Sequence, residues 1–171
     1  MFLLSCENDP QQAKALANTD NAQVDIAKDV RLMYKESGKL TALITAPLMH
    51  RYFRNENKIE FPEGVVVELY NNGNLTCTIN AGYGMRDETT KRMDASKGVK
   101  VQNYKKEQME SEEMVWSEVA KEIRVDGKVK VTTPNDVLYG VGLVADDQFN
   151  NYTMSKITGR LSVEDNNIPG R

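Results

Sequence analysis

Side chains that commonly carry chemistry are scarce in this sequence. Among 171 residues there is one histidine, His50, and there are two cysteines, Cys6 and Cys77, too few for a zinc site with four Cys or His ligands. No Gly-x-Ser-x-Gly motif and no phosphate-binding loop occurs. The adjacent acids at 112–113 and 146–147 would point to opposite faces of a strand, so neither pair forms an acid–base dyad. We therefore expect no enzyme and no cofactor.

Long apolar runs and an excess of basic charge are also missing. No apolar stretch approaches the roughly 20 residues that a membrane-spanning helix needs. The chain has 22 basic and 25 acidic residues, a net charge of −3, which gives nucleic-acid binding no electrostatic support. The hydrophobic content of 40% nevertheless fits a folded protein, and 171 residues can bury a core. We expect one folded domain and no nucleic-acid partner.

The first residues resemble the end of a bacterial lipoprotein signal. Leu3-Leu4-Ser5-Cys6 fits a lipobox in which Cys6 is acylated, although the basic start and most of the apolar stretch of such a signal do not precede it. A polar segment rich in Ala, Gln and Asn follows, as expected of a flexible tether. The alternative is an unmodified thiol at Cys6. The predicted division is a signal remnant at 1–6, a tether at 7–24, a β-domain at 25–163 and a C-terminal tail at 164–171.

After the tether, apolar and polar residues alternate in short runs. Residues 65–69 and 75–81 flank Asn72-Gly73, a pair that strongly favours a two-residue hairpin turn. The same alternation recurs at 99–102 and 128–132, and no segment keeps a helical period of 3.6. The pattern predicts an all-β, antiparallel domain.

The sequence also repeats itself. Residues 37–46 align with 72–81, and residues 59–67 align with 93–101 and, more loosely, with 123–131. Each unit reads as a long strand, a turn, a short strand, a glycine turn and another strand, with one apolar face that it cannot bury alone. Stacked units would bring two apolar faces together, which predicts a sandwich or an elongated two-sheet jelly roll.

These repeats resemble a known family. The pattern G-x-L-x-x-x-I-x-A, which begins at Gly38 and at Gly73, and the later G-V-x-V resemble the repeats of the LptC/LptA/OstA group of lipopolysaccharide-export proteins. Residues 137–146, 152–154 and 159–161 resemble the closing strands of LptC. The likeness covers about residues 25 to 163, and it implies a periplasmic jelly roll that is open along one side and at its ends.

The resemblance implies a carrier or scaffold in lipopolysaccharide export. Lipid A acyl chains would pass between the two sheets, from an inner-membrane export ABC transporter to an LptA-like bridge protein that pairs edge to edge. An acyl group on Cys6 would replace the N-terminal membrane helix of LptC, as in the lipoprotein-type members of Bacteroidota, with the inner membrane favoured over the outer. Two alternatives stay open: a membrane-tethered β-repeat adaptor that carries no lipid, and an OstA-like bridge component that stacks head to tail.

Strand alternation in the aligned repeats predicts which side chains face the interior. Matched positions hold small residues, such as Ala42 with Cys77, which would leave room for a guest acyl chain. The alternative is a closed core that these residues simply fill. The predicted lipid-lining residues are Leu40, Ala42, Ile44, Val65, Val67, Leu75, Cys77, Ile79, Val99 and Val101.

The C-terminal strands are predicted to form the open edge that meets the bridge protein. An edge exposes unpaired N–H and C=O groups, and the glycines at 140 and 142 would let a partner backbone approach. The predicted edge consists of Tyr139, Gly140, Val141, Gly142, Leu143 and Val144 together with residues 152–161.

Basic residues gather in two places, at 51, 54 and 58 and at 97, 100, 105 and 106. In the context of the family they are candidates for contact with lipid A phosphates at the rim of the groove. A solvated face is the alternative for each of them. Trp116, the single tryptophan, is expected to cap the core rather than to bind a ligand.

Overall fold

The computed structural model describes residues 24–53 and 57–162, and in these ranges the chain forms eleven strands and no helix. All the pairings between strands are antiparallel, which confirms the predicted all-β jelly roll. The strands are β1 (Val24–Glu36), β2 (Lys39–Tyr52), β3 (Lys58–Phe61), β4 (Val65–Asn71), β5 (Asn74–Ala81), β6 (Tyr83–Asp87), β7 (Arg92–Asn103), β8 (Gln108–Ser117), β9 (Glu122–Thr132), β10 (Asp136–Asp146) and β11 (Tyr152–Ser162).

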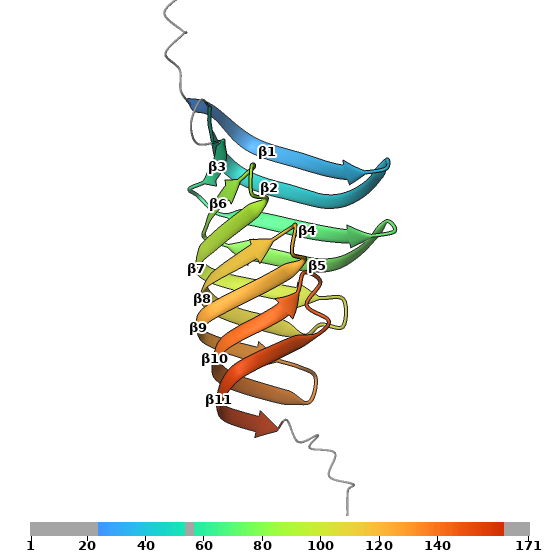
Figure 1. Ribbon diagram of the computed structural model, residues 1–171, viewed down its shortest axis with the longest axis vertical. Coiled ribbons are helices and arrows are strands. Elements are labelled where there is room, and N and C mark those ends of the chain that lie inside the picture. The colour runs from blue at the N-terminus through green and yellow to red at the C-terminus, as the bar shows by residue number, and fades with distance from the viewer. Residues whose placement is uncertain (1–23, 54–56, 163–171) are drawn as a thin grey trace, which may run out of the picture.

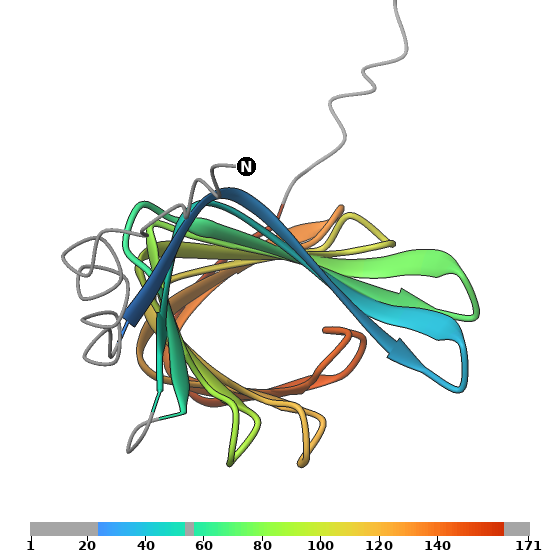
Figure 2. The same cartoon turned by 90° about the horizontal axis from the view of Figure 1, so that it is seen from above.

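The strands stack from β1 at one end of an elongated molecule to β11 at the other (Figure 1). Most of them are long and bend, so that one half of each strand lies in one sheet and the other half in a second sheet. The first, which we call the β4 sheet, contains β4, β5 and residues 30–36, 39–46, 99–103, 108–111, 128–132, 136–141 and 156–162. The second, the β3 sheet, contains β3, β6 and residues 24–28, 48–52, 92–96, 113–117, 122–125, 143–146 and 152–154. Seen from above, the strands form a curved wall around the interior (Figure 2).

Bulges make the corner between the two sheets. The pairing register shifts between Ser96 and Val99, between Ser111 and Val115 and between Val141 and Leu143, where the strands pass from one sheet to the other. An extra residue in a strand bends it and increases its twist. The predicted glycine turn is right in the first repeat, where β3 and β4 are separate strands, and wrong in the second and third. Gly98, with φ +78°, lies inside the continuous strand β7, and Gly127 lies inside the continuous strand β9.

The hairpin turns of the first two repeats agree with prediction. Ser37 and Gly38 have φ values of 49° and 77°, and Asn72 and Gly73 have values of 49° and 83°. Two successive residues with positive φ between paired strands are the mark of a type I′ turn, which the Asn-Gly pair favours. Both hairpins project to the same side of the molecule (Figure 1).

A β-bulge at a threonine follows each of these two turns. The Thr41 hydroxyl donates a hydrogen bond of 3.2 Å to the carbonyl of Tyr34, and the Thr76 hydroxyl donates one of 3.0 Å to the carbonyl of Leu69. At each threonine the strand pairing shifts by one residue. Because a one-residue shift reverses the alternation of side chains, the residues nearer the turn no longer follow the buried face. Leu75 is accordingly 45% exposed.

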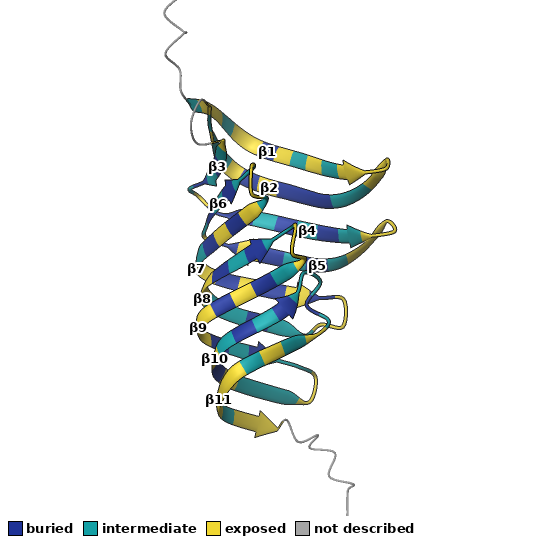
Figure 3. Ribbon diagram, in the orientation of Figure 1, coloured by how far each residue is buried: buried dark blue, intermediate teal, exposed yellow. Residues whose placement is uncertain are grey.

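The hydrophobic core lies between the two sheets. From the β4 sheet it takes Ile44, Val67 and Val101, and from the β3 sheet it takes Phe61 and Met93, all fully buried. Buried and exposed residues alternate along the central strands, whereas β1 and β11 are mostly exposed (Figure 3). The core thus runs along the stack and thins toward both ends.

Within the described residues β1 pairs only with β2, and β11 pairs only with β10, so these two strands are the edges of the stack. The predicted edge is right for residues 152–161, which lie in β11, and wrong for Tyr139, Gly140, Val141, Gly142, Leu143 and Val144, because β10 pairs with β9 on one side and with β11 on the other. The backbone that approaches Gly140 is β11 itself, at the carbonyl of Lys156. Both edge strands run in the same direction, from the β3 sheet to the β4 sheet.

Candidate functional site

A groove of about 560 Å³ opens between the two sheets, beside the tips of the β1–β2 and β4–β5 hairpins. Its apolar lining comes from both walls, with Ala42, Ile44 and Leu69 from the β4 sheet and Trp116 from the β3 sheet. Charged residues surround this floor at the mouth. An apolar cleft with a few convergent polar groups is the usual form of a site for an amphiphilic ligand.

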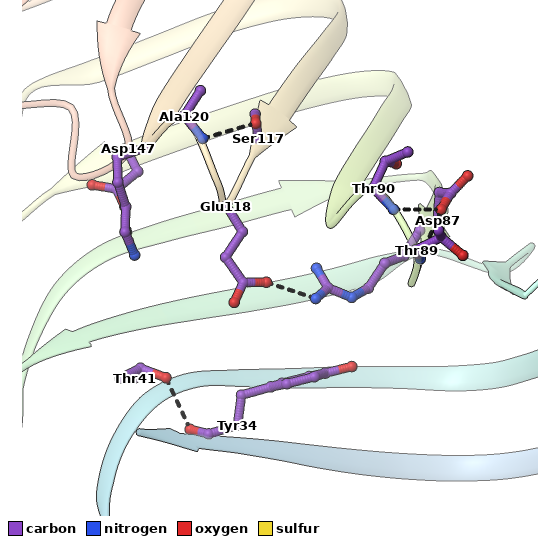
Figure 4. A network of polar contacts seen from close by, with 11 residues as sticks. Tyr34, Thr41, Asp87, Thr89, Thr90, Ser117, Glu118, Ala120 and Asp147 are labelled. Atoms are coloured by element: carbon purple, nitrogen blue, oxygen red, sulfur yellow. Dashed lines mark hydrogen bonds and ion pairs between the residues drawn. The ribbon is translucent and has the colours of Figure 1, made fainter. Parts of the chain in front are cut away.

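One charged side chain lies inside this groove rather than at its mouth. Arg86, on β6, is only 1% exposed, and its Nη2 donates a hydrogen bond of 2.7 Å to Oε2 of Glu118. Its guanidinium carbon is 5.0 Å from the ring centroid of Tyr34 and 5.9 Å from that of Trp116. In Figure 4 a dashed line joins the Glu118 carboxylate to this guanidinium, and the Tyr34 side chain lies below them in the view. Since Tyr34 belongs to the β4 sheet and Glu118 follows the β3 sheet, Arg86 bridges the two walls.

The interior is closed differently farther along the stack. Phe149, in the loop between β10 and β11, is fully buried and stacks on Tyr152 with 5.2 Å between the ring centroids. Its carbonyl accepts a hydrogen bond of 2.8 Å from Nδ2 of the buried Asn103 at the end of β7. A loop that follows the β3 sheet is thereby fastened to the β4 sheet, which covers the interior at the level of the C-terminal strands.

Asp146 holds that loop in shape. Its carboxylate accepts hydrogen bonds from the backbone N–H groups of Gln148, Asn150 and Asn151 and from the side-chain amide of Asn151, at 2.9 to 3.2 Å. Burial by itself would raise the pKa of Asp146, but these bonds favour the ionised form and hold the pKa below its usual range. The loop thus depends on an ionised Asp146.

The family model of lipopolysaccharide-assembly, LptC-related proteins matches residues 1–160. The chain belongs to the LptC-related family. No curated protein matches the sequence significantly.

Membership of the LptC-related family supports a role in lipopolysaccharide transport in the cell envelope, with lipopolysaccharide and components of its transport system as partners. The family is one of transport and scaffold proteins. In the described part of the chain, no helix combines the length and the apolar character needed to cross a membrane. The predicted lipidation of Cys6 falls outside the described residues.

The predicted lining residues of this LptC-related chain lie at different places. Ala42 and Ile44 line the groove. Leu40 and Leu75 lie beyond the threonine bulges, where both are partly or largely exposed. The others are buried in the core between the sheets, namely Val65, Val67, Cys77, Ile79, Val99 and Val101. Contact of these residues with lipid stays a prediction.

Sequence reasoning missed Arg86 and proposed other basic residues instead, of which Arg54 lies outside the described residues. Of these, Arg51 pairs with Glu88 at 3.0 Å and lies on the same face of the β3 sheet as Ile59 and Arg86, whereas Lys97 lies 5.1 Å from the ring centroid of Tyr83. Alternation along β6 puts Arg86 on the same face as Gly84, but nothing in the sequence indicates that this face points inward. Trp116 is buried, as expected of a core residue, and it also lines the groove.

The single histidine belongs to a polar cluster outside the groove. Nδ1 of His50 lies 3.3 Å from the Glu60 carboxylate, which also accepts hydrogen bonds from the hydroxyls of Tyr52 at 2.7 Å and Tyr83 at 2.9 Å. The bond from Tyr52 is the main reason that the pKa of Glu60 is lowered, and burial raises the pKa of Tyr83 to about 12. Across the described residues, no three His, Cys, Asp or Glu side chains come together as metal ligands.

Proposed function

We propose that this LptC-related protein shelters the acyl chains of lipid A in the groove between its two sheets during lipopolysaccharide export. The observation that carries the proposal is the apolar floor of Ala42, Ile44, Leu69 and Trp116 beneath a charged mouth. Such a site suits a molecule that has hydrocarbon chains and a polar headgroup.

Burial of the hydrocarbon chains contributes favourable free energy to such a role. Each methylene removed from water contributes about 0.8 kcal/mol, so sheltering about ten of them contributes on the order of 8 kcal/mol. This gain offsets part of the cost of association, so the guest is held reversibly. A carrier needs that balance, because it must release what it binds.

The proposed route runs along the stack, and it requires the loop of Phe149, which covers the interior near the C-terminal strands, to move aside. The guest comes from an inner-membrane ABC transporter near the β1 end, and it leaves at β11 to an LptA-like bridge protein that pairs with this edge strand. An exposed strand edge can add a further strand through its free N–H and C=O groups. An acyl group on Cys6 would hold the protein at the inner membrane.

Site-specific photo-crosslinking tests the groove. A photoreactive residue at Ile44, which lines the groove, should capture lipopolysaccharide in cells, whereas one at the neighbouring Thr45, which is exposed, should not. Adjacent strand residues point to opposite faces, so the pair is a matched control. Equal capture at both positions would contradict the proposal. Capture at neither, with transporter binding retained, would favour a protein-binding adaptor.

Proline substitutions test the edge. In a strand paired on one side, one of two neighbouring N–H groups faces the partner strand and the other faces away. Of Lys156→Pro and Ile157→Pro in β11, one should therefore disrupt the β10–β11 pairing, and the other should keep the fold and lose the bridge protein in a pull-down. If both variants fold and both bind, the handover does not use β11.

A further inference from the structure

A groove that binds only hydrocarbon does not require a buried charged side chain such as Arg86. Within the described residues it is the one charged side chain that is buried, and it is the largest of the fully buried side chains. A buried charge is costly unless it is fully paired. Its Nη2 is paired with Glu118, but its Nε and Nη1 have no hydrogen-bond partner in the described structure.

The counter-charge of Arg86 is not fixed as firmly as the arginine. The Glu118 side chain is 39% exposed and lies in the turn between β8 and β9, at the mouth of the groove. The Glu118 carboxylate can be hydrated at this position, but its departure alone would leave the buried charge of Arg86 without a partner. Glu118 can therefore leave only when another anion takes its place on Arg86.

The charges around the groove also favour an anion. Its lining contains four basic side chains, Lys35, Arg86, Lys91 and Lys121, against the three acidic side chains of Glu36, Glu118 and Asp147. The groove is therefore net positive, whereas the whole chain has a net charge of −3. Removal of Glu118 from the pair would make the positive charge of the groove larger.

We propose that Arg86 is the anion-recognition residue of the groove, and that Glu118 occupies the place of the anion until a guest arrives. The guest is an amphiphile whose chains lie on Ala42, Ile44 and Leu69 and whose phosphate exchanges with the Glu118 carboxylate on the guanidinium. Arginine suits this exchange because its fixed donors match both carboxylate and phosphate oxygens. The inference rests on the proposed function and adds the feature of the guest that is recognised.

Trp116 provides a direct readout, because it is the single tryptophan and its ring centroid is 5.9 Å from the guanidinium carbon. Its fluorescence is followed while the full-length chain is titrated with phosphorylated lipid A in micelles, with the dephosphorylated lipid, and with inorganic phosphate alone. Wild type should bind the phosphorylated lipid more tightly than the dephosphorylated one. A response to inorganic phosphate at the same concentrations would mean that a free anion is enough and would contradict an amphiphilic guest.

Two variants separate recognition of the anion from binding of the chains. Arg86→Gln should weaken binding of the phosphorylated lipid roughly tenfold or more, which is the loss expected for one hydrogen bond to a charged group, and should leave the dephosphorylated lipid unchanged. Glu118→Gln keeps the shape of the side chain, removes the competing charge and should tighten binding of the phosphorylated lipid only. Circular dichroism establishes that each variant is folded. Because Arg86 is buried, its replacement by glutamine puts the fold at risk. If Arg86→Gln does not fold, the affinity of Glu118→Gln for the phosphorylated lipid tests the proposed anion recognition.

Equal affinities of wild type and both folded variants for the phosphorylated lipid would overturn the role of Arg86 and leave the proposed acyl-chain site intact. A wild-type protein that binds neither lipid, and that captures none through Ile44, would overturn both. The two failures are therefore distinguishable.

Discussion

At the scale of single residues, Cys77 shows what the interior does to an ionisable group. It is 1% exposed, and burial, with smaller contributions from the charges of Asp147 and Asp146, raises the pKa of its thiol to about 12. The reactive form of cysteine is the thiolate, which is therefore almost absent at neutral pH. Cys77 behaves as a small apolar residue of the core.

This protection gives a measurable outcome. Iodoacetamide at pH 8 should alkylate Cys77 only when the domain opens, because the folded thiol is both covered and protonated. Mass spectrometry of the peptide that contains Cys77, taken over a urea series, should show labelling that follows the unfolding curve. Fast labelling in the absence of urea, at the rate of an ordinary thiol, would contradict the buried placement.

The paired threonine bulges can be tested in the same way. Thr76→Val removes the hydroxyl that bonds to the carbonyl of Leu69 and should lower the free energy of unfolding by about 0.5 to 1.5 kcal/mol. Thr78→Val, two residues away on the same strand, is the matched control, because the Thr78 hydroxyl has no such bond within the described residues. Equal urea midpoints for the two variants would mean that the bulge does not depend on this bond.

Residue-level prediction from the sequence succeeded where a local rule decides. Asn72-Gly73 has the positive φ values that its turn requires, and the central aligned positions such as Ile44 and Ile79 are buried. It failed at Leu75, because one inserted residue reverses alternation and the threonine that marks the insertion looks like any other strand threonine. Arg86 escaped for a different reason: its burial depends on Tyr34 and Trp116, which are distant in sequence and meet it only in the fold.

At the scale of elements, β10 and β11 are held together by close backbone contact at Gly140. A Cβ added there would meet Sδ of Met154 and lie 2.5 Å from the carbonyl oxygen of Lys156. The methionine can move aside, but the backbone carbonyl cannot without shifting β11. The glycine that was expected to admit a partner protein instead admits the last strand of the same chain.

Gly140→Ala should therefore lower the free energy of unfolding by roughly 1 to 3 kcal/mol, as overpacking commonly does, and should loosen β11 first. Gly127→Ala is the matched control, since a Cβ at Gly127 meets nothing within 4 Å. That control should be neutral or slightly stabilising, because alanine restricts the unfolded chain. Hydrogen exchange of β11 measures the effect, and unchanged exchange in Gly140→Ala would contradict the close contact.

For whole elements, the alternation of apolar and polar residues predicted the strands but not the corners between the two sheets. Alternation predicted the strands around residues 65–69, 75–81, 99–102 and 128–132, and all four are strands. The corner was not predicted, because a bulge such as the one at Gly98 has the same residue types as a turn. Whether the chain reverses or continues there is decided by the neighbouring strands, which supply the hydrogen bonds. For the same reason the sequence placed both β10 and β11 at the edge and could not tell that β10 is internal.

At the scale of the whole molecule, the interior is open as a groove beside the β1–β2 and β4–β5 hairpins and is covered by the loop of Phe149 near the C-terminal strands. The groove is bridged by a charge pair and a cation–π contact at Arg86, whereas the C-terminal level is covered by Phe149 and tied to Asn103. The second closure depends on the carboxylate of Asp146. Acid should therefore destabilise the loop between β10 and β11 more than the groove.

Because the pKa of Asp146 is lower in the folded state than in the unfolded chain, its contribution to stability is complete above about pH 4 and is lost as the pH falls through the folded value. Asp146→Asn should cost about 1 to 3 kcal/mol at neutral pH, because the amide cannot accept both bonds from Asn151. It should also make stability depend less on pH in this acidic range. Asp126→Asn, at an exposed position, is the control for urea unfolding at several pH values. An unchanged pH dependence in Asp146→Asn would show that the loop is held by other contacts.

The common direction of the two edge strands has a consequence for how such molecules can be joined. A second copy that continued both sheets would set its β1 beside β11 with the two chains running the same way, so the joint would be parallel, whereas every pairing inside the molecule is antiparallel. A parallel ladder is slightly less stable per residue than an antiparallel one. A different protein whose edge strand runs the opposite way would form the stronger joint. The direction of the edge strands thus slightly disfavours filaments of identical subunits and favours pairing of β11 with an antiparallel strand of a different protein.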